Sequence, residues 1–232
     1  MVNCAPCWIA CLLPPLGAYN GQRILLWLDV CMSLELVFAA ALSRPDLLAA
    51  PVAAALRDLP GADDVEVAEI DPALADTTAF CEQYGVLPSE SANCVVIVAK
   101  RSGQTSYAAC VVAATTRADV NNLVRRHLDA RKASFAPVEA ITAAAGMEYG
   151  GITPVGLPAG WPVLVDEGVA QTRSVIVGSG IRGSKLRLPG ALLAGLAEAQ
   201  VLPGLGIPVD PSRLVTLSNA TTDGNRICEG AL

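Results

Sequence analysis

The sequence is poor in the residues that most enzymes use for acid–base and metal chemistry. It contains a single histidine, His127, among 232 residues. A catalytic triad or a Cys–His pair would have to use that residue, and a site with several histidine ligands is excluded. The cysteines Cys4, Cys7 and Cys11 resemble half of a zinc site, but no second half follows nearby. We therefore expect no metal ion and no cofactor.

Aromatic and charged residues are scarce as well, at 4% and 16% of the chain, whereas hydrophobic residues make up 53%. This composition excludes a disordered chain and predicts a sizeable core of small and β-branched side chains. The eight cysteines are too few for a disulfide scaffold. Two of them, Cys94 and Cys110, lie in apolar runs where a reduced thiol acts as a small hydrophobic side chain. These features favour a cytoplasmic protein.

No uninterrupted apolar run is long enough to cross a membrane. Residues 1–22 carry no charge, so the basic start of a secretory signal is missing, and Asp29 and Glu35 interrupt the next apolar stretch. We expect no stable membrane association. We interpret residues 1–43 as a leader or extension, poorly ordered, and residues 207–232 as a C-terminal tail with one short strand at 214–217. The working domain is then expected over residues 44–206.

Charge is distributed unevenly along a chain of net charge −6 and isoelectric point near 4.8. Residues 61–90 contain eight acidic and no basic residues, whereas residues 91–133 contain seven basic and two acidic ones. An acidic protein has no general attraction to phosphate backbones, which excludes a non-specific nucleic-acid coat. A local basic face remains compatible with the pattern.

The middle of the chain alternates helical and strand patterns without a regular βαβ rhythm, which predicts an α+β domain. Pro45 opens an alanine-rich helix that Pro51 kinks or restarts. Thr116 is placed to cap a helix with Asp119 three residues on. Helices are expected at 45–59, 72–84, 116–128, 137–146 and 189–199, and strands at 65–70, 94–99, 107–114, 163–165, 175–178 and 185–188.

A glycine pattern at residues 178–183 matches the G-x-G-x-x-G fingerprint of dinucleotide-binding proteins. That fingerprint requires a helix after the glycines, whereas the strand-like sequence 185–188 follows here. The nearest acidic residue, Glu198, also comes too early. A tight glycine turn between two strands explains the residues better.

The densest feature is the segment 146–158, which contains Gly150, Gly151, Pro154, Gly156 and Pro158. Glycines permit positive φ and let the backbone approach a ligand closely. Such a loop can present successive N–H groups to an ester carbonyl or an oxyanion without any charged side chain. A structural crossover between two strands remains the alternative.

Residues 150–156, Gly-Gly-Ile-Thr-Pro-Val-Gly, resemble the G-x-x-x-P loop of YbaK-type proteins, the editing domain associated with prolyl-tRNA synthetase. Segments 130–136, 161–166, 177–180 and 185–188 are similar to its neighbours in the same order, so the resemblance covers roughly residues 44–206. It implies an α+β fold with a mixed, barrel-like β-sheet surrounded by helices. It further implies a trans-acting aminoacyl-tRNA deacylase that needs no cofactor.

The resemblance also assigns roles to residues of this sequence. The residues implied in catalysis are Gly150, Gly151, Pro154 and Asn93, those in substrate binding are Thr153, Asp166, Ser179 and Gly180, and those in tRNA contact are Arg125, Arg126, Arg131 and Lys132. Asp166 has an alternative, structural role as an acid at the start of a helical turn. Arg125 and Arg126 have the alternative of being ordinary residues on a solvated helix face. The implied partners are an aminoacyl-tRNA and an aminoacyl-tRNA synthetase.

One departure concerns the start of the first long strand, where the family's editing enzymes commonly carry a lysine and this chain has Asn93. Lys100 lies about 20 Å further along that strand and cannot replace it. Asparagine donates a hydrogen bond but supplies no charge. Three readings therefore stay open: an editing deacylase, a silent module that binds an aminoacyl group, a tRNA or a synthetase, and a hydrolase of small esters.

Overall fold

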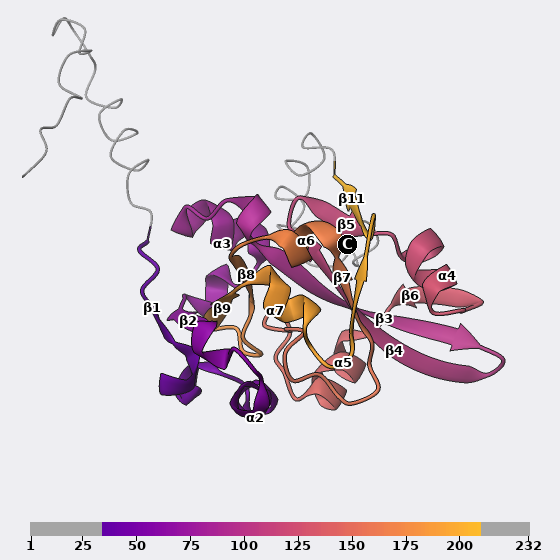
Figure 1. Cartoon of the computed structure of the whole chain (residues 1–232), viewed down its shortest axis with the longest axis horizontal. Coiled ribbons are helices and arrows are strands. Elements are labelled where there is room, and N and C mark those ends of the chain that lie inside the picture. The colour runs from indigo at the N-terminus through magenta and orange to yellow at the C-terminus, as the bar shows by residue number, and fades with distance from the viewer. Residues whose placement is uncertain (1–33, 210–232) are drawn as a thin grey trace, which may run out of the picture. The chain divides into compact units, whose positions relative to one another are not determined.

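The computed structural model describes residues 34–209 of the chain (Figure 1). The expected leader up to residue 33 and the expected strand at 214–217 lie outside the described residues. The ordered fold starts ahead of residue 44, because β1 (Phe38–Ala40) pairs with a later strand. It also extends past residue 206, since β11 (Gly206–Pro208) pairs with β5 (Thr116–Ala118) as a small two-stranded sheet.

A four-stranded antiparallel sheet carries the turn that the glycine fingerprint occupies. Its strand order is β1, β2 (Glu66–Glu69), β9 (Ser184–Leu188) and β8 (Val175–Gly178). The 178–183 segment is the tight connection between β8 and β9, which pair antiparallel from Val175↔Leu188 to Gly178↔Lys185. A strand follows the glycines, as the sequence analysis predicted, so this segment is a strand-to-strand turn.

The larger sheet has five strands and is mixed. Its order is β10 (Ala199–Leu202), β7 (Val163–Asp166), β4 (Gln104–Ala113), β3 (Ala92–Arg101) and β6 (Lys132–Phe135). β7 pairs parallel with both β10 and β4, whereas β3 pairs antiparallel with both β4 and β6. Figure 1 shows the β3–β4 hairpin reaching beyond the rest of the sheet. A single bridge, Ser91↔Ile176, joins the two large sheets.

These sheets and the helices around them confirm the α+β class. The strands of residues 34–209 form separate sheets rather than one closed barrel. The helices are α2 (Ala50–Asp58), α3 (Thr77–Tyr84), α4 (Arg125–His127), α5 (Val138–Ala145), α6 (Glu167–Gln171) and α7 (Gly190–Ala194). No helix in residues 34–209 has the length and apolar character needed to cross a membrane.

Several predicted helices are shorter than the sequence pattern suggested. Pro45 opens only a 3₁₀ turn, and α2 begins afresh with Pro51 in its first turn, where the missing N–H of proline costs nothing. The prediction that Thr116 caps a helix was wrong, because Thr116 lies in β5. Asp119 instead caps the following π-helical turn by accepting hydrogen bonds from the amides of Asn122 and Leu123. The last predicted helix ends early, at Ala194; a turn follows, and its final residue, Ala199, begins β10.

The core is built from small aliphatic side chains, as the composition indicated. Fully buried members include Val52, Leu56, Val165 and Leu186, which lie between α2 and the two large sheets. Phe80 on α3 is the largest side chain among the most deeply buried residues. It packs with Ile176 of β8 and fixes α3 against the four-stranded sheet. This packing brings the start of α3 next to the β8–β9 turn.

Candidate active site

The glycine-rich segment after α5 runs alongside the β8–β9 turn. Gly146 ends α5 in the left-handed region, with φ 64°, and its amide donates to the Thr142 carbonyl. The Glu148 amide then donates to the Gly180 carbonyl at 2.8 Å, and the Gly180 amide donates back to the Gly151 carbonyl at 2.7 Å. Two backbone hydrogen bonds therefore clamp the loop onto the turn.

Only glycine fits where these two backbones meet. A Cβ atom on Gly151 would lie inside the contact distance of the Ile181 carbonyl, and one on Gly178 would strike the Gly151 carbonyl. Gly180 has φ 89° and faces the side chains of Ala49 and Val52. The predicted site residues Gly151 and Gly180 thus shape the loop through close backbone packing.

The loop also keeps hydrogen-bond donors that no described group satisfies. Within residues 34–209, the amides of Gly150 and Thr153 have no protein acceptor. Gly150 is exposed and has φ 85°, whereas Thr153 and Pro154 are buried. The Thr153 hydroxyl is fully buried and has no partner in the described part of the chain. A buried hydroxyl without a partner, such as that of Thr153, is uncommon in proteins and calls for a functional explanation.

Two basic side chains of the β8–β9 region approach the loop. Arg182 lies over Gly150 and donates to the carbonyls of Tyr149 at 3.1 Å and Pro72 at 3.0 Å. Its backbone amide donates to the Glu148 carboxylate at 2.7 Å. Arg182 therefore connects the glycine loop to the segment just before α3.

Lys185 of β9 is buried beside the same segment. Its ammonium donates to the Ala75 carbonyl at 2.8 Å and lies 5.3 Å from the centre of the Phe80 ring. Burial lowers the pKa of Lys185 to about 8, although nearby Asp76 acts in the opposite direction. Sequence analysis missed both Arg182 and Lys185, because their closeness to the loop depends on the β8–β9 turn folding back beneath it.

Asn93 lies at the start of β3, as predicted, and faces α3. Its side-chain oxygen accepts a hydrogen bond from the Thr77 hydroxyl at 2.6 Å, which leaves its NH₂ group available to donate. Asp76 caps α3 by accepting from the amide of Thr78. Gly150 adjoins Ala75, since a Cβ atom on Gly150 would lie 3.8 Å from the Ala75 Cβ.

The start of α3 is therefore the meeting point of three segments: β3, the glycine loop and β9. We call these residues the α3-start cluster: Asp76, Thr77, Asn93, Gly150, Arg182 and Lys185. The cluster combines two cations and the Asp76 carboxylate, which caps α3, with amide and hydroxyl groups, and it has no histidine. Such a set can hold and polarise a carbonyl or carboxyl group, whereas histidine-based nucleophilic catalysis is outside its means.

The three cysteines within residues 34–209 add no activated nucleophile. Burial raises the pKa of the Cys81 thiol, which lies on α3, and that of Cys110 to about 12. The pKa of Cys94 is raised as well, again by burial. These thiols stay protonated at neutral pH, and the thiol form is a poor nucleophile.

Two of the predicted substrate-binding residues are engaged in structural contacts. The Asp166 carboxylate caps α6 by accepting from the Gly168 amide at 3.0 Å, and it also accepts from the Gly206 amide at 2.8 Å. The Ser179 hydroxyl is fully buried, bonds to the Ser184 hydroxyl at 2.6 Å and lies inside the β8–β9 turn. The geometry supports a structural role for both side chains.

The predicted tRNA-contact residues gather at one end of the five-stranded sheet, near the tip of the β3–β4 hairpin. Lys132 of β6 lies directly opposite Lys100 of β3, and Arg131 donates its amide to the Lys100 carbonyl. Arg101 pairs with Asp129. Figure 1 shows α4, with its two arginines, beside β6. We call this surface the basic hairpin patch: Lys100, Arg101, Arg125, Arg126, Arg131 and Lys132.

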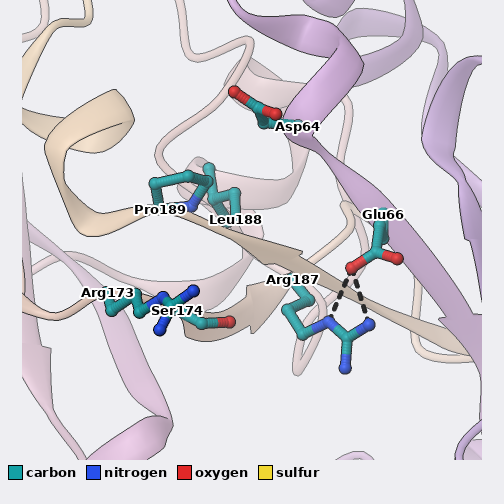
Figure 2. A pocket seen from close by; sticks show the side chains of 7 residues that line it. All are labelled: Asp64, Glu66, Arg173, Ser174, Arg187, Leu188 and Pro189. Atoms are coloured by element: carbon teal, nitrogen blue, oxygen red, sulfur yellow. Dashed lines mark hydrogen bonds and ion pairs between the residues drawn. The ribbon is translucent and has the colours of Figure 1, made fainter.

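Two surface hollows lie away from the glycine loop. One, of about 360 Å³, belongs to the basic hairpin patch and is lined by Arg101, Ser102, Ala130 and Arg131. The other, of about 560 Å³, is shown in Figure 2 and is lined by residues of β2, β9 and their flanks, including Glu66 and Arg187. The Arg187 guanidinium forms an ion pair with Glu66 at 2.6 Å there. The glycine loop lines neither of these two hollows, and Gly150 is one of its exposed residues.

Comparison with known protein families finds a match. Residues 71–196, more than half of the chain, match the family model of the aminoacyl-tRNA editing domain. No curated protein matches the chain. That segment contains the α3-start cluster, the glycine loop and the basic hairpin patch.

Solved structures show the same fold at low sequence identity. A proposed trans-editing enzyme for prolyl-tRNA synthetase is 21% identical, with a TM-score of 0.58 over 67% of this chain and 94% of that one. A scaffold protein used for computational epitope grafting is also 21% identical, with a TM-score of 0.57 over 67% and 95% of the two chains. A hypothetical protein is 20% identical, with a TM-score of 0.51 over 57% and 85%. The resemblance seen in the sequence is confirmed, and the chain belongs to the aminoacyl-tRNA editing domain family.

Proposed function

We propose that the protein hydrolyses the ester bond of a mischarged aminoacyl-tRNA, acting in trans as a free-standing editing enzyme. One observation carries the proposal: a family glycine loop in which the backbone donors at Gly150 and Thr153 are among those without protein acceptors. A synthetase pocket discriminates poorly between small apolar side chains, so a second site that destroys the wrong product supplies the missing accuracy.

The chemistry follows from what the cluster contains. Backbone amides of the loop hold the ester carbonyl oxygen, and the NH₂ group of Asn93 positions the aminoacyl group. A water molecule adds to the carbonyl carbon, and the bond from that carbon to the ribose oxygen breaks. The ribose oxygen takes up the proton that the water gives away, aided by the neighbouring ribose hydroxyl. The products are a free amino acid and an uncharged tRNA.

The basic hairpin patch supports a tRNA partner. Lys100 and Lys132 are direct cross-strand neighbours, an arrangement that is unfavourable unless an anion offsets it. Within the patch, the ion pair of Arg101 with Asp129 neutralises one of six cations. Phosphate groups of a nucleic acid would neutralise the others, and the overall acidity of the protein would confine binding to this surface.

A second candidate is a binding module of the same family that does not turn over its ligand. Asn93 in the place of the family lysine favours it, since asparagine supplies no charge to a developing oxyanion. The two hollows away from the loop favour it as well. Such a module would hold an aminoacyl group, a tRNA or a synthetase.

Incubation of the purified protein with a panel of mischarged tRNAs distinguishes the two functions. Gly150→Val tests the loop, because a side chain there would meet the Arg182 guanidinium. Gly160→Val is its matched control: Gly160 has a similar φ of 82°, is exposed and has open space around it. Editing predicts deacylation faster than in buffer, lost in Gly150→Val and kept in Gly160→Val. Binding with an unchanged ester lifetime would overturn the enzymatic proposal in favour of the module.

A further inference from the structure

Lys185 is the one lysine of the chain that the fold buries. The other two, Lys100 and Lys132, are exposed in the basic hairpin patch, whereas Lys185 is 6% exposed. Its position on β9 is opposite Ala68 of β2 and Gly178 of β8. The small size of both neighbours gives the long side chain room to run toward α3.

The ammonium of Lys185 has more donors than the protein uses. It makes one hydrogen bond, to the Ala75 carbonyl, although an ammonium has three N–H groups. Among residues 34–209, no carboxylate lies within ion-pair distance of it. Buried lysines are normally paired, because burying an unpaired charge is costly. A buried cation with two unused donors is therefore poised for an acceptor that comes from outside the protein.

Lys185 lies at the point where the other parts of the cluster meet. Its ammonium holds the carbonyl of Ala75, the residue whose side chain adjoins Gly150. Two residues further on, Thr77 donates to Asn93. The first turn of α3 thus joins Lys185, the glycine loop and the position of the missing family lysine.

We propose that Lys185, from β9, supplies the positive charge that Asn93 lacks, and that its ammonium binds the carbonyl oxygen of the ester as negative charge develops on it. This inference rests on the proposed deacylase function and names a further catalytic residue for it. The ammonium acts through hydrogen bonds and charge, and no proton leaves it during the reaction. The charge is worth more at this buried position than in water.

The groups that face Lys185 are consistent with this role. α3 contributes Asp76, whose charge favours the ammonium form, together with Cys81 and Phe80, and the β8–β9 turn contributes Arg182. Burial is the largest influence and lowers the pKa of Lys185 to about 8. The side chain is therefore mainly protonated at neutral pH and loses its proton within the accessible pH range.

The test measures the single-turnover rate of deacylation, with saturating protein, on the mischarged tRNA that the wild-type protein edits. Lys185→Met and Lys185→Arg are compared with the wild type. Arg187→Met is the matched control, since Arg187 lies two residues further along β9 and pairs with Glu66 outside the cluster (Figure 2). We expect about a 100-fold slower step in Lys185→Met, as for removal of one oxyanion donor, with tRNA binding unchanged. Lys185→Arg should retain part of the rate, and Arg187→Met all of it.

The pH profile separates a catalytic charge from a structural one. After subtraction of the spontaneous hydrolysis, the wild-type rate should fall as pH rises through about 8, the pKa of Lys185. The residual rate of Lys185→Met should lack this fall. Full activity in Lys185→Met, or a wild-type rate that does not fall above pH 8, would overturn the role of Lys185 alone. Absence of deacylation by wild-type protein on every tRNA would instead overturn the proposed function.

Discussion

Replacing Lys185 by methionine should stabilise the fold at neutral pH while it removes activity. The pKa of this lysine is lowered from 10.5 to about 8 by burial, which corresponds to roughly 3 kcal/mol of destabilisation by the charged form. Methionine has a similar length and no charge, but it leaves the Ala75 carbonyl without its donor. An unsatisfied buried carbonyl costs about 1–3 kcal/mol. The net gain expected at pH 7 is therefore about 1 kcal/mol.

The pH dependence gives this prediction its sign. Because the folded-state pKa is below the unfolded value, the unfolded chain binds more protons between pH 8 and pH 10.5. Wild-type stability should therefore rise through this window by on the order of 3 kcal/mol relative to Lys185→Met. Above the window the lysine is neutral in both states, and the variant should be the less stable protein.

Urea unfolding followed by circular dichroism, at several pH values between 7 and 11 and under reducing conditions, measures this difference. Arg187→Met is again the control, because Arg187 lies on the same strand and its replacement leaves the buried Lys185 in place. A stability difference between wild type and Lys185→Met that is constant with pH would refute the reasoning. A Lys185→Met variant that is several kcal/mol less stable than the wild type at pH 7 would also refute it, because the lysine would then stabilise the fold.

Three further predictions concern the patch, the loop and the cap. The double variant Arg131→Ala/Lys132→Ala should weaken tRNA binding and reduce the slope of log affinity against log salt concentration by about 1–2. The control Arg57→Ala, at an exposed residue outside the patch, should change neither quantity. Equal slopes for the double variant and the wild type would contradict a phosphate contact. Gly151→Ala should lower the free energy of unfolding by more than 2 kcal/mol through its clash with Ile181, measured by urea unfolding. Asp166→Ala should lower the free energy of unfolding by about 1–2 kcal/mol, because α6 loses its cap. The deacylation rate of the folded protein should stay unchanged. A loss of rate without a loss of stability would instead place Asp166 in catalysis.

Local signals in the sequence identified much of the fold. Apolar runs at 94–99 and 107–114 predicted two strands, which form the β3–β4 hairpin. The observed β3 is longer at both ends, whereas β4 begins earlier and ends one residue sooner. Gly85 and Gly146 were placed at helix ends, and both have positive φ there. Turn and cap chemistry depends on residues close in sequence, so one chain suffices to recognise it.

Non-local pairing explains the errors in the fold. Ala199 closes the predicted helix at 189–199, yet it begins β10 because β7 offers an open edge in parallel register. Thr116 resembles a helix cap, but β11 pairs with residues 116–118 and moves the cap to Asp119. Tertiary pairing overrides local propensity in both cases, and nothing in the sequence near these residues signals it.

The candidate site was found in part for the same reason. The glycine loop and Asn93 were recognisable from their spacing, whereas Lys185 and Arg182 looked like residues of an ordinary strand and turn. Their roles depend on the turn between β8 and β9, which brings residues about thirty positions apart along the chain to the same loop. The sequence of β9, Ser-Lys-Leu-Arg-Leu, alternates Lys185 and Arg187 with leucines, so nothing in it marked Lys185 as the buried cation.

The central claim is that backbone amides of the glycine loop grip the acyl carbonyl. An NMR titration with an aminoacyl-adenosine analogue, whose ester is replaced by a stable amide, tests it most directly. The amide resonances of Gly150 and Thr153 should shift strongly and saturably, while that of Gly160 stays in place. Saturable binding that leaves both loop amides unmoved would contradict the claim.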